Sequence, residues 1–195
     1  MKLSDVESRN IKGEQPEEAD TGYTYDIMDI LKEEGITEEV LVEASMGLYT
    51  PHPGIETREK AEALFIRELR LAISDPNLCM LIYSGILLER EGRNGTLPNI
   101  SRDSYERDLT FLIADEVLGM SISKYISGDK GMFEFVRFDK QKPGILAELG
   151  PFMDDVIGGL IGGVSANMYT RGMAEIGKSK NKDDDEKHGG GVIAG

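Results

Sequence analysis

The segment that most constrains the fold places two adjacent acids ahead of two pairs of glycines, in residues 151–163, PFMDDVIGGLIGG. Pro151 suits the first turn of a helix, and the apolar pattern predicts that this helix runs from Phe152 to Tyr169. Asp154 and Asp155 would then lie near the N-terminus of the helix, where its dipole favours negative charge.

The four glycines of this helix lie one and two turns beyond the acids: Gly158, Gly159, Gly162 and Gly163. Each glycine inside a helix costs about 0.5–1 kcal/mol relative to alanine, so four of them indicate a packing or ligand-access requirement. A face without side chains lets another backbone approach closely.

A mixed cluster of acids and bases stands shortly before this helix, and its members are Arg137, Asp139, Lys140 and Lys142. The following Pro143-Gly144 should end the helix that carries them.

The composition predicts one soluble domain. The chain has 195 residues, 39 % of them hydrophobic, which is enough for one sizeable core. The polar stretches suggest a disordered arm at 1–22, a helical domain at 23–173 and a disordered tail at 174–195. The tail contains DDDEKH, where three aspartates and a histidine could bind a metal, although a solvated tail is the stronger interpretation.

The charge and the cysteine content limit the partners and the compartment. A net charge of −14 argues against nucleic acid or an anionic membrane surface as the main partner. The single cysteine, Cys79, lies in an apolar run and is read as a buried core residue. One cysteine and no recognisable signal peptide fit a reducing cytoplasm. A homo-oligomer is left open.

Between the tails the apolar spacing predicts helices and hardly any strand. The expected helices are Tyr25–Glu34, one capped by Thr37 that runs to Tyr49, one capped by Thr57 that spans 58–74, Asp75–Glu91, Asp103–Ser127 and Phe152–Tyr169. A loop carries His52, which is more often a surface residue than a ligand or base. The fold class is therefore an all-α, single-domain bundle.

The predicted helix at 103–127 carries Asp115 and Glu116 in its middle and is apolar on nearly every side, as in a helix surrounded by others. A buried carboxylate is costly unless it is paired or bound to a metal. Gly119 and Ser123 lie one and two turns beyond Asp115. Close packing of two small-residue faces would bring Asp115 or Glu116 towards the Asp154 pair.

Several carboxylates that converge on one buried point would need a cation. The oxygen donors favour Mg²⁺ or Mn²⁺, which could polarise a phosphoryl oxygen while Lys142, with Arg137 or Lys140, holds the phosphate. Phosphate-ester hydrolysis is the matching reaction class. The alternative is structural: Asp154 and Asp155 complement a helix dipole, Asp139 pairs with a lysine, and the glycines serve packing.

Three segments, IADEVLGM, FVRFDKQKPGI and FMDDVIGG, resemble in this order the motifs of the phosphatidylglycerophosphatase A family of metal-dependent phosphatases. The resemblance extends through DILKEEGIT and LIYSGILLE, covers 25–171, and is greatest to the soluble archaeal branch of alpha-ribazole phosphatases of the CobZ type.

This resemblance implies about six helices around a central helix, Mg²⁺ or Mn²⁺ as cofactor, and a small phosphorylated nucleoside-like substrate, alpha-ribazole 5′-phosphate of cobamide assembly. The acidic motif positions of the family fall on these residues: Asp115, Glu116, Asp139, Asp154 and Asp155. The Lys-Pro of the family falls on Lys142 and Pro143.

The lipid phosphatases of the family have transmembrane segments. Here the most apolar candidate, 152–169, carries Asp154, Asp155 and Asn167, so stable membrane insertion is not expected. Three functions remain: the soluble phosphatase, a phosphatidylglycerophosphate phosphatase, and a non-catalytic helical bundle that binds a divalent ion or a partner.

Overall fold

The fold is an all-α bundle built around one long helix. A computed structural model describes residues 26–107 and 112–188, with the side chains of 177–188 left out of the description. Eight α-helices and a short 3₁₀ helix occupy these residues: α1 Ile27–Glu33, α2 Glu38–Gly47, α3 Arg58–Ala72, α4 Pro76–Asn94, α5 Arg102–Glu106, α6 Ala114–Ser127, α7 Asp129–Gln141, η2 Gly144–Ala147 and α8 Pro151–His188. The predicted fold class is confirmed.

Helices α2, α3 and α4 begin where the sequence predicts, whereas α1 begins at Ile27 instead of Tyr25. Thr37 and Thr57 accept hydrogen bonds from the backbone N–H groups three residues ahead, at 3.4 and 3.3 Å. Asp75 accepts from the N–H of Asn77 at 2.8 Å, and Pro76 follows it in the first turn. These side chains satisfy N–H groups that have no partner inside the helix, which fixes the three starting points.

The predicted single helix at 103–127 is wrong, because α5 ends at Glu106 and a separate helix, α6, begins at Ala114. Tyr105 of α5 lies against Gly92 near the end of α4, whereas α6 packs along α8 and also contacts α4. As a result Asp115 and Glu116 lie in the first turn of α6, and Val117 and Tyr125 are half exposed on its outer side.

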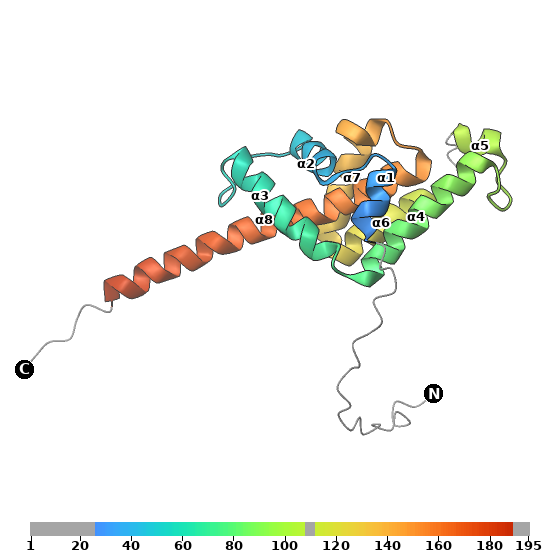
Figure 1. Cartoon of the computed structure of the whole chain (residues 1–195). Helices are drawn as coiled ribbons and strands as arrows, with labels where there is room; N and C mark the ends of the chain where they lie inside the picture. The colour runs from blue at the N-terminus through green and yellow to red at the C-terminus, as the bar shows by residue number, and fades with distance from the viewer. Residues whose placement is uncertain (1–25, 108–111, 189–195) are drawn as a thin grey trace, which may run out of the picture.

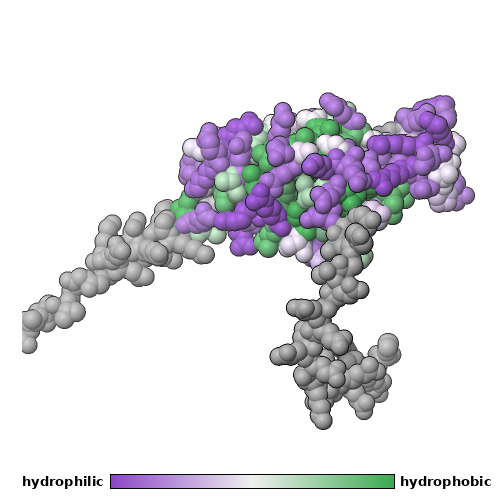
Figure 2. Space-filling view, viewed as in Figure 1, coloured by the Kyte–Doolittle hydropathy of each residue, from purple (hydrophilic) through white to green (hydrophobic). Residues whose placement is uncertain are grey.

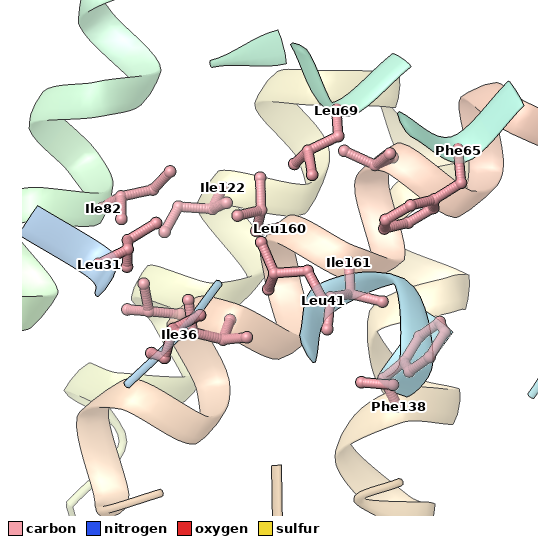
Figure 3. Close-up of a cluster of buried hydrophobic side chains, with 14 of the residues drawn as sticks. Leu31, Ile36, Leu41, Phe65, Leu69, Ile82, Ile122, Phe138, Leu160 and Ile161 are labelled. Atoms are coloured by element: carbon pink, nitrogen blue, oxygen red, sulfur yellow. The ribbon is translucent and has the colours of Figure 1, made fainter. Parts of the chain in front are cut away.

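Helix α8 is the central element, and it contacts α2, α3, α4, α6, α7 and η2. Figure 3 shows Leu160 and Ile161 of α8 among side chains from the surrounding helices. Both are fully buried. Because each such side chain contributes about 1.5–3 kcal/mol when buried, this layer provides much of the stability.

The second half of α8 continues to His188 and projects beyond the other helices (Figure 1). The predicted end at Tyr169 is therefore wrong, and 174–188, expected as an unstructured tail, are helical. Residues 178–188 contain no glycine or proline, so nothing in their sequence breaks the helix. The predicted arm at 1–22 lies outside the described residues.

The visible face is largely hydrophilic, with hydrophobic patches between the hydrophilic residues (Figure 2). Within the described ranges, no single helix is long and apolar enough to cross a membrane. Helices α3 and α4 meet that length and composition together, but only as a pair bent by 92°.

Candidate active site

The site begins with a close crossing of α6 and α8. A Cβ added to Gly119 of α6 would lie 2.5 Å from the carbonyl oxygen of Asp155, and one added to Gly159 of α8 would lie 2.3 Å from the carbonyl oxygen of Gly119. Neither distance leaves room for a side chain. The predicted close approach between the two small-residue faces is confirmed.

This crossing brings Asp115 of α6 towards the first turn of α8. Asp115, Asp154 and Asp155 are each more than 90 % buried, and Asp139 is half-buried near the end of α7. The charges of Asp154, Asp115 and Asp139 all act on Asp155. Four of the five predicted acids therefore form one cluster, which we call the acid cluster.

Glu116, the fifth predicted acid, is exposed on the surface of α6. Neighbouring residues of a helix point about 100° apart, so the orientation that buries Asp115 turns Glu116 away. Its backbone N–H donates to the Asp115 carboxylate at 2.9 Å. The sequence could not decide which of the two acids points inwards.

Asp155 shows the electrostatic consequence of the acid cluster. Burial, followed by the negative charges of Asp154, Asp115 and Asp139, raises the pKa of Asp155 to about 8, and Lys142 opposes the rise. Both main causes disfavour the ionised carboxylate. Asp155 is therefore mostly protonated at neutral pH unless a cation compensates the cluster.

Lys142 reaches the cluster from a tight turn after α7. Its backbone is left-handed, with φ of 39°, and its N–H donates to the carbonyl of Phe138 at 2.7 Å, which closes the helix as the Lys-Pro-Gly sequence predicts. The turn packs against α2, where Pro143 contacts Gly47.

The Lys142 ammonium donates to the Asp154 carboxylate. Burial lowers the pKa of Lys142, but the hydrogen bond and charge of Asp154, together with Asp139 and Asp155, raise it above its ordinary value. Lys142 thus remains a cation, and its side chain is 39 % exposed, so it can meet a ligand from solvent.

The donor set suits a hard divalent cation in its chemistry. It consists of carboxylate oxygens that are largely shielded from solvent, and a bound cation would reduce the repulsion between them. In the described part of the chain, however, no three acid, histidine or cysteine side chains converge into a ready-made metal site. A lysine ammonium lies against Asp154, so cation binding would require side-chain rearrangement.

The other predicted bases lie outside the acid cluster. Arg137 pairs with Glu134 at 2.6 Å and donates to the carbonyl of Leu48 at 3.1 Å, and Lys140 is exposed. The His52 ring contacts Tyr169, with 6.1 Å between centroids. The acids of the 183–185 run and His188 fall in the part of α8 whose side chains are not described.

Glu89 also belongs to the surroundings of the site, and it was not identified from the sequence. This carboxylate is 1 % exposed, and it accepts hydrogen bonds from the backbone N–H groups of Phe152 and Met153, directly before Asp154. Its sequence signal was an acid at a core-facing position of the apolar run LIYSGILLE, combined with a helix start, Gly150-Pro151, that has no capping side chain.

Known proteins share this chain's sequence and fold. MJ1330, an uncharacterized protein of Methanocaldococcus jannaschii, is 34 % identical over 134 residues, which cover 66 % of this chain and 99 % of MJ1330. The chain belongs to the MJ1330 family. No family model matches it.

Two proteins of Bacillus species extend the MJ1330 comparison. YutG of Bacillus subtilis, also uncharacterized, is 28 % identical over 144 residues, or 60 % of this chain and 84 % of YutG. A solved structure of a protein of unknown function from Bacillus stearothermophilus superposes with a TM-score of 0.64 and 27 % identity, covering 74 % of this chain and 96 % of that one. The same fold therefore occurs in a protein of a Bacillus species.

Proposed function

We propose that this protein is a metal-dependent phosphatase that hydrolyses alpha-ribazole 5′-phosphate to alpha-ribazole and phosphate. The observation that carries the proposal is the crowding of Asp155 by Asp154, Asp115 and Asp139 beside the Lys142 ammonium. Like charges crowd a buried carboxylate here, and a bound cation would relieve that crowding. Such a cluster is typical of a cation site.

The residues have distinct proposed roles. Asp115, Asp139, Asp154 and Asp155 would hold Mg²⁺ or Mn²⁺, and Lys142 would bind a phosphate oxygen of the substrate. When bound, the metal would supply polarisation of the phosphoryl oxygen and a more acidic water. The Lys142 side chain is long and half in solvent, so its ammonium can leave Asp154 for an incoming phosphate.

The substrate class comes from the motif resemblance. The segments that contain Asp115, Asp139 and Asp154 resemble the phosphatidylglycerophosphatase A motifs, and the upstream segments resemble the soluble archaeal branch. Within that resemblance the lipid substrate is the second candidate, and a non-catalytic metal-binding bundle is the third.

A phosphate-release assay tests the proposal. The substrates are alpha-ribazole 5′-phosphate, phosphatidylglycerophosphate and common nucleoside monophosphates, each with Mg²⁺ and with EDTA. We expect Mg²⁺-dependent release from the ribazole ester, loss of that release in Asp154→Asn, and no loss in Asp129→Asn, which removes an exposed acid in the first turn of α7. Release from the lipid alone would favour the second candidate. Tight Mg²⁺ binding without release from any ester would favour the third.

A further inference from the structure

The first turn of α8 has no capping side chain of its own. The backbone N–H of Asp154 donates to the carbonyl of Gly150 at 3.0 Å, which makes Gly150 the residue that precedes the helix. Serine, threonine, aspartate or asparagine usually fills this position and caps the next free N–H groups. Gly150 has no side chain, and Pro151 has no N–H, so two N–H groups remain to be satisfied.

Glu89 of α4 satisfies both of these groups. One of its carboxylate oxygens, Oε2, accepts from the N–H of Phe152 at 3.1 Å and from the N–H of Met153 at 3.3 Å. The capping carboxylate therefore comes from a different helix. Since the acids of the site begin at the next residue, this cap holds the turn that carries them.

The Glu89 carboxylate is itself fixed from two sides. Its other oxygen, Oε1, accepts from Nε of Arg93 at 3.0 Å, and Nη1 of Arg93 lies 3.5 Å from the carboxylate of Glu34, which directly follows α1. A Cβ added to Gly150 would lie only 1.8 Å from Oε1 of Glu89. A side chain at position 150 would therefore force the Glu89 carboxylate to shift from its observed place.

We propose that Glu89 is a positioning residue of the candidate active site, which fixes the first turn of α8 and thereby the directions of Asp154 and Asp155. The term "active site" rests on the proposed function, but the positioning of the two acids does not. Without the cap, two buried N–H groups lose their acceptor and the first turn can fray. Residues that orient metal ligands typically change metal affinity or activity ten- to a hundredfold when they are replaced.

The first test is backbone amide hydrogen exchange without added metal. In wild type we expect the N–H groups of Phe152 and Met153 to be protected. Glu89→Ala should remove that protection, and Glu89→Gln, which keeps an acceptor oxygen, should restore much of it. Gly150→Ala keeps the glutamate at position 89. It should also remove the protection, because the new methyl group would occupy the place of the Glu89 carboxylate.

The second test is Mg²⁺ affinity by calorimetry on the same variants. We expect Mg²⁺ to bind about ten- to a hundredfold more weakly to Glu89→Ala and Gly150→Ala than to wild type. Glu68→Gln is the matched control: Glu68 of α3 is also a buried carboxylate, it pairs with Arg67 and with Arg171 of α8, and it lies far along α8 from the first turn. This control should lose stability while keeping both the amide protection and the Mg²⁺ affinity.

The two tests separate this proposal from the proposed function. If Phe152 and Met153 stay protected in Glu89→Ala and Gly150→Ala, or if Glu68→Gln loses their protection equally, Glu89 is not a positioning residue. If the protection follows Glu89 but wild type binds no Mg²⁺ and releases no phosphate, the positioning is supported and the proposed function is wrong.

Discussion

At the scale of single residues, Asp155 shows how packing changes chemistry that the sequence only suggests. Two adjacent aspartates at a helix start would ordinarily be solvated and stabilised by the helix dipole. The close crossing with α6 buries both and adds the charge of Asp115, so the pKa of Asp155 rises to about 8. The sequence identified the acids, but burial and mutual distance determine their ionisation.

The raised pKa predicts how stability depends on pH. The folded protein keeps the Asp155 proton up to about pH 8, whereas the unfolded chain loses it near the ordinary value of 3.8. The unfolded state therefore binds fewer protons between these values, and stability falls as pH rises, by at most about 1.4 kcal/mol per pH unit from this group.

Urea unfolding in EDTA at several pH values from about 5 to about 9.5, a range that extends past the folded pKa, measures this effect. Wild type should lose stability with rising pH relative to Asp155→Asn, which has no such proton. The curves of the two proteins should then level off together above the folded pKa. Parallel curves throughout the range would contradict the raised pKa.

Lys142 leads to a different prediction. If its ammonium binds substrate phosphate, Lys142→Ala should lower kcat/KM by on the order of a hundredfold, since one electrostatic contact in a partly dry site is lost. The Mg²⁺-dependent shift in melting temperature should persist, because the carboxylates remain. The control is Lys140→Ala, whose side chain is exposed on the same helix end. Equal losses of kcat/KM in both variants would contradict a specific contact between Lys142 and the substrate phosphate.

At the scale of elements, the crossing of α6 and α8 sets the geometry of the acid cluster. Of the four paired glycines of α8, Gly159, Gly162 and Gly163 face another chain segment within 3.0 Å of an added Cβ, while Gly158 faces only the Phe135 ring, at 3.6 Å. The glycine pattern thus predicted close packing correctly, but the sequence could not say which glycine was dispensable.

A matched pair of substitutions tests this crossing. Gly158→Ala should be neutral or stabilising by about 0.5–1 kcal/mol, because alanine favours the helix and its methyl group meets an ordinary contact. Gly159→Ala should destabilise by about 1–3 kcal/mol or more, because its methyl group would force α6 away from α8. The measurement is thermal unfolding of both variants. Similar changes in stability in the two would contradict the close approach of α6 to α8 at Gly159.

The start of each element was easier to predict than its extent. Thr37, Thr57 and Asp75 marked helix starts because capping is local chemistry. The break between α5 and α6 was missed because 103–118 contain no glycine or proline that would mark it. The cap from Glu89 was missed because its partner lies 63 residues further along the chain.

At the scale of the whole molecule, one central helix joins the site to the rest of the fold. The sequence predicted a surrounded helix at 103–127, but the surrounded helix is α8, which contacts α2, α3, α4, α6 and α7, whereas α6 has an exposed outer side. Composition could not predict the continuation to His188, because polar residues form helices as well as tails. The sequence placed the acids near one another, but it could not show that Asp115 faces inwards and Glu116 faces outwards.

The projection of α8 predicts tolerance to truncation. The last described side chains of α8 that pair with α3 are Arg171 and Glu175. A protein that lacks 1–22 and 178–195 should therefore keep its helical circular-dichroism signal, and its melting temperature should change little. The measurement is unfolding of the full and shortened chains side by side. Loss of phosphate release with an intact fold would instead assign the removed residues to the site.

The central claim is that the acid cluster binds one divalent cation, and proton release on Mg²⁺ binding tests it most directly. Calorimetry at about pH 7 in buffers of different ionisation enthalpy counts the protons. Because the pKa of Asp155 is raised to about 8, Mg²⁺ binding should release a proton from wild type, and much less from Asp155→Asn. Absence of Mg²⁺ and Mn²⁺ binding, or equal proton release from both proteins, would contradict the claim.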